Sequence, residues 1–117
     1  MPALRWSDPM TANELGANPL AGWQYEFIPL QWGNGAVVKL MQRATTNNVR
    51  QTVFATSQTM VQRSPIQGGG TAWVTPSELN TAPDVFIAQP GDRLIIANDE
   101  TGGAVATVDG IIIVEPA

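Results

Sequence analysis

The chain has 117 residues, of which 44% are hydrophobic and only 14% charged, with a formal net charge of −4. This length fits one domain with one hydrophobic core. Cysteine and histidine are absent, which excludes disulfides, thiolate nucleophiles, metal sites built on these residues and the usual general base. The basic residues are scattered singly, and no apolar run approaches the roughly 20 residues of a membrane span. We therefore expect neither nucleic acid nor a membrane as a partner, and no secretion signal.

Residues 1–23 predict an extended N-terminal arm. Prolines and glycines at this density prevent a long helix and interrupt a sheet. A disordered tail, however, is poor in large apolar residues, and this segment contains several. We expect the arm to dock either on its own domain or on a neighbour. In the second case, removal of residues 1–22 leaves a folded domain, residues 24–117, that binds its partner poorly.

From residue 24 onward, alternating apolar and polar residues predict about eight short strands separated by turns. Expected strands cover residues 24–32, 36–43, 49–63 with a break at 57–58, 71–75, 85–88, 94–97, 104–108 and 111–114. Because turn signals recur about every 8 to 15 residues and helical periodicity is absent, the sequence predicts an all-β, antiparallel β-sandwich with jelly-roll-like wiring. An up-and-down barrel is the alternative. The strand at residues 111–114 is expected at a sheet edge, where a neighbouring chain or arm has to cover it.

Few residues carry chemistry. The glycines at 33–35 and 67–71 lack the context of a nucleotide-binding loop, so we interpret them as turns. Acidic side chains near the C-terminal turns offer oxygen ligands for calcium without the spacing of a calcium loop, and turn formation explains them better; these are Asp92, Asp99, Glu100 and Asp109. No serine has a histidine partner. We expect no enzymatic activity, no cofactor and no metal.

Large apolar residues, above all tryptophans, are the more informative signal. Trp73 is expected to pack in the core. The arm has little core of its own, and large aromatic side chains are enriched at protein interfaces. The candidates for a protein interface are therefore Leu4, Trp6, Met10, Leu15, Leu20, Trp23 and Trp32. A tryptophan platform that binds sugar rings is the rival interpretation.

In its overall pattern of residues, the chain resembles the capsid decoration, or cement, proteins of tailed bacteriophages. The resemblance lies in the proline-rich apolar arm, the strands rich in Thr, Gln and Asn, the glycine loop at 67–71, and residues 90–96 ahead of residues 109–113. It implies a β-rich dimer or trimer without enzymatic activity that binds the major capsid protein on the outside of the head. Such a protein is made in the host cytoplasm and resides on the virion.

Two other classes of function stay open. One is a β-sandwich module that binds glycans or a host surface. The other is a small coat subunit that assembles a shell alone, although the sequence lacks the basic inner face expected for a packaged genome.

Overall fold

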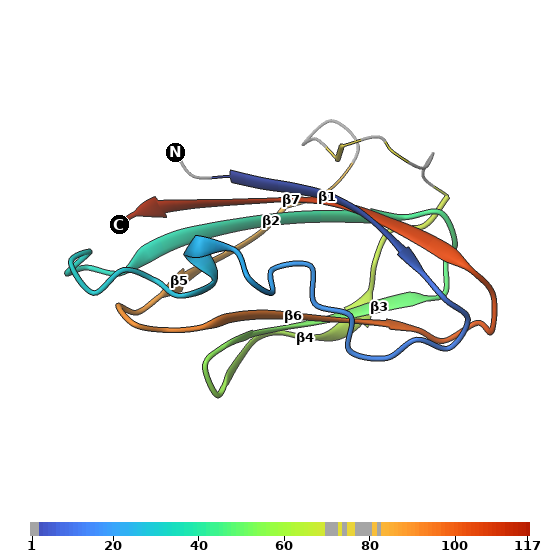
Figure 1. Ribbon diagram of the computed structural model, residues 1–117, viewed down its shortest axis with the longest axis horizontal. Coiled ribbons are helices and arrows are strands. Elements are labelled where there is room, and N and C mark those ends of the chain that lie inside the picture. The colour runs from blue at the N-terminus through green and yellow to red at the C-terminus, as the bar shows by residue number, and fades with distance from the viewer. Residues whose placement is uncertain (1–2, 70–72, 74, 77–80, 82) are drawn as a thin grey trace.

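The computed structural model describes residues 3–69, 73, 75–76, 81 and 83–117. These residues form seven strands and one short 3-10 turn (Figure 1). In chain order the elements are β1 (Ala3–Met10), η1 (Gln24–Glu26), β2 (Ala36–Ala44), β3 (Val49–Ala55), β4 (Gln58–Pro65), β5 (Asp84–Ala88), β6 (Leu94–Glu100) and β7 (Ala106–Pro116). The all-β prediction is confirmed. In the described part of the chain, no helix is long and apolar enough to span a membrane.

The strands form two antiparallel sheets. Sheet A has the order β1-β7-β2-β5, and sheet B has the order β4-β3-β6. Sheet A therefore joins the first and last strands of the fold, which lie side by side in Figure 1. The β3–β4 hairpin turns where the sequence predicted a break, and its register shifts at Val53.

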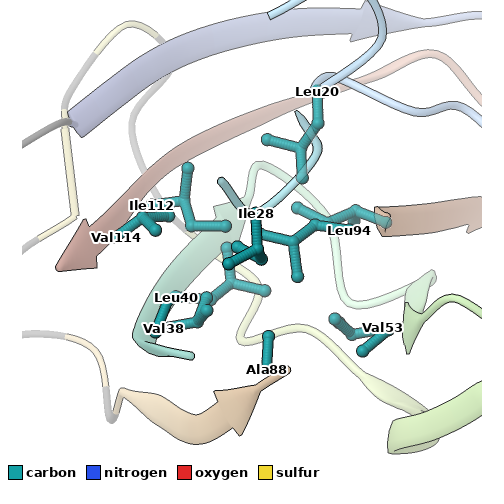
Figure 2. Close-up of a cluster of buried hydrophobic side chains, with 12 residues drawn as sticks. Leu20, Ile28, Val38, Leu40, Val53, Ala88, Leu94, Ile112 and Val114 are labelled. Atoms are coloured by element: carbon teal, nitrogen blue, oxygen red, sulfur yellow. The ribbon is translucent and has the colours of Figure 1, made fainter. Parts of the chain in front are cut away.

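Apolar side chains at every second position of the strands point inward and fill the space between the two sheets. In β2, for example, Ala36, Val38 and Leu40 are completely buried, whereas Val37 and Lys39 between them are half-buried on the outer face. The main core cluster draws on both sheets (Figure 2). Its buried members are Leu20, Ile28, Ala36, Val38, Leu40, Val53, Ala55, Ala88, Leu94, Ile96, Ile112 and Val114. A second, smaller cluster contains Met10, Ala44, Val49, Ile66, Ala106 and Val108.

The N-terminal segment docks on its own domain, which is the first of the two expected alternatives. β1 pairs with β7 over its whole length, from Ala3 opposite Ile113 to Met10 opposite Ala106. The expectation of a sheet edge at residues 111–114 is therefore wrong. β7 lies inside sheet A, with β1 on one side and β2 on the other, because the arm supplies the missing neighbour.

The expected strand at residues 24–32 is absent. This stretch holds the η1 turn and irregular backbone instead. Ile28 is buried and donates its backbone N–H to Asp92, while Glu26 is buried against Arg93 at 2.7 Å. Ile28 and Glu26 therefore anchor this stretch as a connection, and Pro29 lacks the N–H that a continuing strand would need to pair with a neighbour.

The two strands expected at 104–108 and 111–114 are a single strand, β7, which begins at Ala106, and Asp109-Gly110 is not a turn. β7 continues through both residues, paired with β1 and β2. Gly110 lies opposite Trp6, and a Cβ at this position would overlap the indole. The glycine thus provides room for a cross-strand tryptophan inside the sheet.

The strand expected at 71–75 falls largely outside the described residues. Trp73 is described, and its expected burial is wrong: the residue is 71% exposed and has a φ of 67°. Its backbone N–H donates to Asp109 at 3.2 Å, so the connection after β4 contacts sheet A at this point.

Candidate functional site

A layer of polar side chains crosses the interior between the two hydrophobic clusters. Gln42 of β2 donates to Gln51 of β3 at 2.7 Å and exchanges hydrogen bonds with Asn98 of β6. Gln51 in turn donates to Asp84 of β5 at 2.9 Å. The three amides are buried, with relative exposures of 5%, 7% and 0%. Since buried amides that satisfy one another fix a single arrangement of their neighbours, this network sets the register of sheet A on sheet B.

A cavity of about 210 Å³ opens beside this network. Its walls are formed by Gln42, Gln51, Ser64, Pro65, Ile66, Gln67, Thr81 and Asp84. The side chains offer amide and hydroxyl groups with one carboxylate, a set that binds water or a small polar group by hydrogen bonds. Among the described residues, no group of three acidic, cysteine or histidine side chains gathers to hold a metal ion.

Sequence reasoning missed the polar layer, although its signal was present. With a period of two, Gln42 falls on the face of Val38 and Leu40, and Gln51 falls on the face of Val49 and Val53. A glutamine at a core-facing position of each of two strands indicates that the two side chains bond to each other, because a lone buried amide is unfavourable.

The acidic residues of the C-terminal turns do not converge. Asp92 accepts hydrogen bonds from Thr56 and Gln89, and Asp99 accepts one from Gly16 and pairs with Arg63 at 3.4 Å. Asp92 thus fixes the turn between β5 and β6, as expected. Asp99 instead lies within β6, so its interpretation as a turn former is wrong, and its carboxylate holds Gly16 and Arg63 against that strand.

Glu100 and Asp109 are the buried members of that set. The backbone N–H groups of Asn13, Gly102, Gly103 and Ala104 all donate to the Glu100 carboxylate. Burial raises the pKa of Glu100, but these four hydrogen bonds outweigh burial, and the net pKa is lowered. Glu100 therefore ties the N-terminal segment to the β6–β7 turn.

Asp109 likewise connects separate segments, on the outer face of sheet A. Its carboxylate accepts hydrogen bonds from the Ser7 hydroxyl at 2.5 Å and from the Trp73 backbone. It thereby links β1, β7 and the connection that follows β4.

Of the seven predicted interface residues, most pack within the chain itself. Met10 and Leu20 are buried. Four others are half-buried against the main cluster, namely Leu4, Trp6, Trp23 and Trp32. Leu15 is 72% exposed. In this structure Leu15 is the member of the set most open to a partner, and binding by the segment stays a prediction.

Trp23 and Trp32 form an aromatic group with Tyr25. Tyr25 stacks on Trp32 with ring centroids 5.7 Å apart, and Trp23 meets Tyr25 edge-on at 5.5 Å. The exposed polar residues Gln24 and Gln31 lie beside them in the sequence.

Seven large apolar side chains of the described residues are exposed, and Leu15 alone among them was predicted as an interface residue. Their relative exposures range from 55% to 77%, and they comprise Leu15, Phe27, Leu30, Trp73, Val85, Ile87 and Val105. Leu15 and Val105 lie at the end of the molecule where Asn13 contacts the β6–β7 turn, and Leu30 lies at the opposite end against Gly91.

Comparisons with protein-family models, curated proteins and solved structures find no match to this chain. The function therefore has to be argued from its own surfaces.

Proposed function

We propose that this protein is a capsid decoration protein that binds the outer surface of a phage head and stabilises contacts between major capsid subunits. It is then made in the host cytoplasm and resides on the virion. The observation that carries the proposal is the set of large apolar side chains left exposed on a weakly charged surface. Apolar side chains of this kind favour protein partners. Low charge limits repulsion between closely spaced copies on a shell.

Jelly-roll wiring with one irregular strand is part of this proposal. In a jelly roll of eight strands, the first pairs with the last, the second with the seventh, the third with the sixth and the fourth with the fifth. The pairs β1–β7, β2–β5 and β3–β4 follow this order if residues 11–35 occupy the place of the second strand. Bridges from Ala17 to Asn98 and from Phe27 to Arg93 support that assignment. Viral coat proteins commonly use this architecture.

The end of the molecule that carries Leu15 and Val105 is the proposed head-binding surface. Leu15 belongs to the N-terminal segment that the sequence singled out, and both side chains are more than two-thirds exposed. The hydrogen bonds to Glu100 hold this end in a fixed shape, so little conformational entropy is lost on binding.

Binding to heads of the phage that encodes this chain tests the proposal. Purified protein is mixed with heads assembled without it and sedimented, and we expect saturable binding. Leu15→Asp and Val105→Asp should each weaken binding by about fivefold or more, since an interface anchor contributes about 1 to 4 kcal/mol. Leu30→Asp, at the opposite end, is the matched control and should bind normally. Absence of co-sedimentation, or assembly of the free protein into shells by itself, contradicts the proposal.

A glycan-binding module is the second candidate, and the Trp23, Tyr25 and Trp32 group favours it. Aromatic rings beside polar side chains are the usual platform for sugars, and jelly rolls also build lectin domains. Retention of the free protein on immobilised glycans, abolished by Trp32→Ala and unaffected by Leu15→Asp, would replace the capsid proposal.

A further inference from the structure

In the part of the chain that the structure describes, β5 is an edge strand that lacks the usual protection against pairing. It lies at one side of sheet A next to β2 (Figure 1). Its sequence, Asp84–Ala88, contains no proline, lysine or arginine. The one charged residue, Asp84, is engaged in the interior by Gln51. Among the described residues, no backbone hydrogen bond joins β5 to a segment other than β2.

The other three edge strands are guarded or covered. β1 carries Arg5, Asp8 and Pro9, and charges and prolines hinder the addition of a further strand. β4 has a shifted register, exposes Arg63 and ends at Pro65.

The outer edge of β6 is occupied by the N-terminal segment. Ala17 exchanges backbone hydrogen bonds with Asn98, and the Glu100 N–H donates to Glu14. β5 is thus the edge strand that no described segment covers and that carries no proline or basic residue.

Two adjacent apolar side chains mark the outer face of β5. Val85 and Ile87 are 60% and 55% exposed. They extend the outer face of β2, where Lys39 lies opposite Val85 and Val37 lies opposite Ile87. A free edge and exposed apolar side chains on the same five residues are the combination expected of a strand that pairs with another chain.

We propose that β5 pairs with β5 of a second copy of this chain, antiparallel about a two-fold axis at Phe86, so that two A sheets form one continuous sheet. This proposal concerns the free protein and does not depend on capsid binding.

The β5 sequence is complementary to itself in that register. Val85 of each copy lies opposite Ile87 of the other, which gathers four apolar side chains on the outer face. Phe86 meets its own counterpart, and Asp84 lies opposite Ala88, so no like charges are opposed. A second copy therefore fits this edge better than a strand of unspecified sequence.

The size of the contact sets the expected strength. Five residues at about 3.4 Å each give an edge of roughly 17 Å, which belongs to the class of small, weak interfaces. We expect a monomer–dimer equilibrium in the micromolar range. Because the contact is uncharged, salt should change it little.

Sedimentation of the full-length protein over about 1 μM to about 1 mM tests for this weak dimer. Ile87→Lys should raise the dissociation constant at least about tenfold, since it removes an apolar contact and places two like charges near the axis. Val105→Lys, at an exposed apolar position just before β7, which β2 separates from β5, is the matched control and should dimerise normally. Monomer at all concentrations, or a dimer insensitive to Ile87→Lys in a variant with unchanged circular dichroism, overturns the proposal.

Cysteine cross-linking tests the register of the β5–β5 pair. Because the chain contains no cysteine, only the introduced residues can form a disulfide. Residues directly opposite have Cα atoms about 4.5 to 5.5 Å apart, within reach of a disulfide, whereas diagonal pairs at about 7 to 8 Å are not. A mixture of Val85→Cys and Ile87→Cys proteins should therefore cross-link faster than either protein alone. Equal rates for the mixture and the single variants reject this pairing, and capture of a different protein's strand in its place rejects the second copy as the occupant.

Discussion

Gly110 and Trp6 form a cross-strand pair in which the glycine has room for hydrogen only. A Cβ at position 110 would overlap Cε2, Cζ2 and Nε1 of the Trp6 indole. Gly110 does not adopt a positive φ, so its backbone conformation is open to alanine. The requirement for glycine therefore comes from the indole alone, and it should disappear when the indole is removed.

The expected energies follow from this geometry. In Gly110→Ala, overpacking lowers the free energy of unfolding by about 1 to 3 kcal/mol. The less flexible unfolded chain raises it by about 0.4 to 1 kcal/mol, so we expect a net decrease of about 1 to 2 kcal/mol. Removal of the half-buried Trp6 side chain exposes about 100 Å², or about 2.5 kcal/mol at about 25 cal/mol per Å². In the Trp6→Ala background, Gly110→Ala should instead stabilise the protein by about 0.5 to 1 kcal/mol.

Urea unfolding of the wild type, both single variants and the double variant measures this coupling. Far-ultraviolet circular dichroism is the suitable signal, because tryptophan fluorescence changes with the substitution itself. The sign of the Gly110→Ala effect should reverse between the two backgrounds. A Gly110→Ala loss that is the same with and without Trp6 would refute the reasoning and assign the glycine a backbone function.

Two further predictions concern the N-terminal segment and acid stability. Deletion of residues 1–22 should unfold the protein, in contrast to the expectation from sequence, because it removes buried Met10 and Leu20, each worth about 2 to 5 kcal/mol; a cooperative thermal transition in the truncated chain would contradict this. The hydrogen bond from Arg93 is the main cause that lowers the pKa of Glu26, and backbone donors lower that of Glu100. Carboxyls with lowered pKa values stabilise the fold above their unfolded pKa near 4.5, and this stability is lost as the pH falls through the folded pKa. Burial and the nearby Glu14 raise the pKa of Asp8, so this group has the opposite effect on the pH dependence of stability. We expect the two groups with lowered pKa values to dominate. The urea concentration at the unfolding midpoint should therefore decrease as the pH is lowered below about 4.5, and this decrease should be smaller in Glu26→Gln.

The sequence by itself determined the fold class and the positions of β2 to β6. In these strands the alternation of apolar and polar residues is local, so strands such as Ala36–Ala44 and Val49–Ala55 can be recognised without their partners. The same alternation places Gln42 and Gln51 on the core-facing side, although only the assembled sheets show that these amides meet each other.

Only the tertiary structure decided what residues far apart in the chain do to one another. Ser7 bonds to Asp109 across 102 positions, and β1 converts the expected edge at 111–114 into an interior strand. Asp109-Gly110 has the composition of a turn, yet Trp6 requires the glycine and Ser7 engages the aspartate. Strand pairing depends on contacts between distant segments, and the energy of those contacts overrides local preference for turn or strand. For the same reason, the exposure of Val85 and Ile87 was not visible until the edge position of β5 was known.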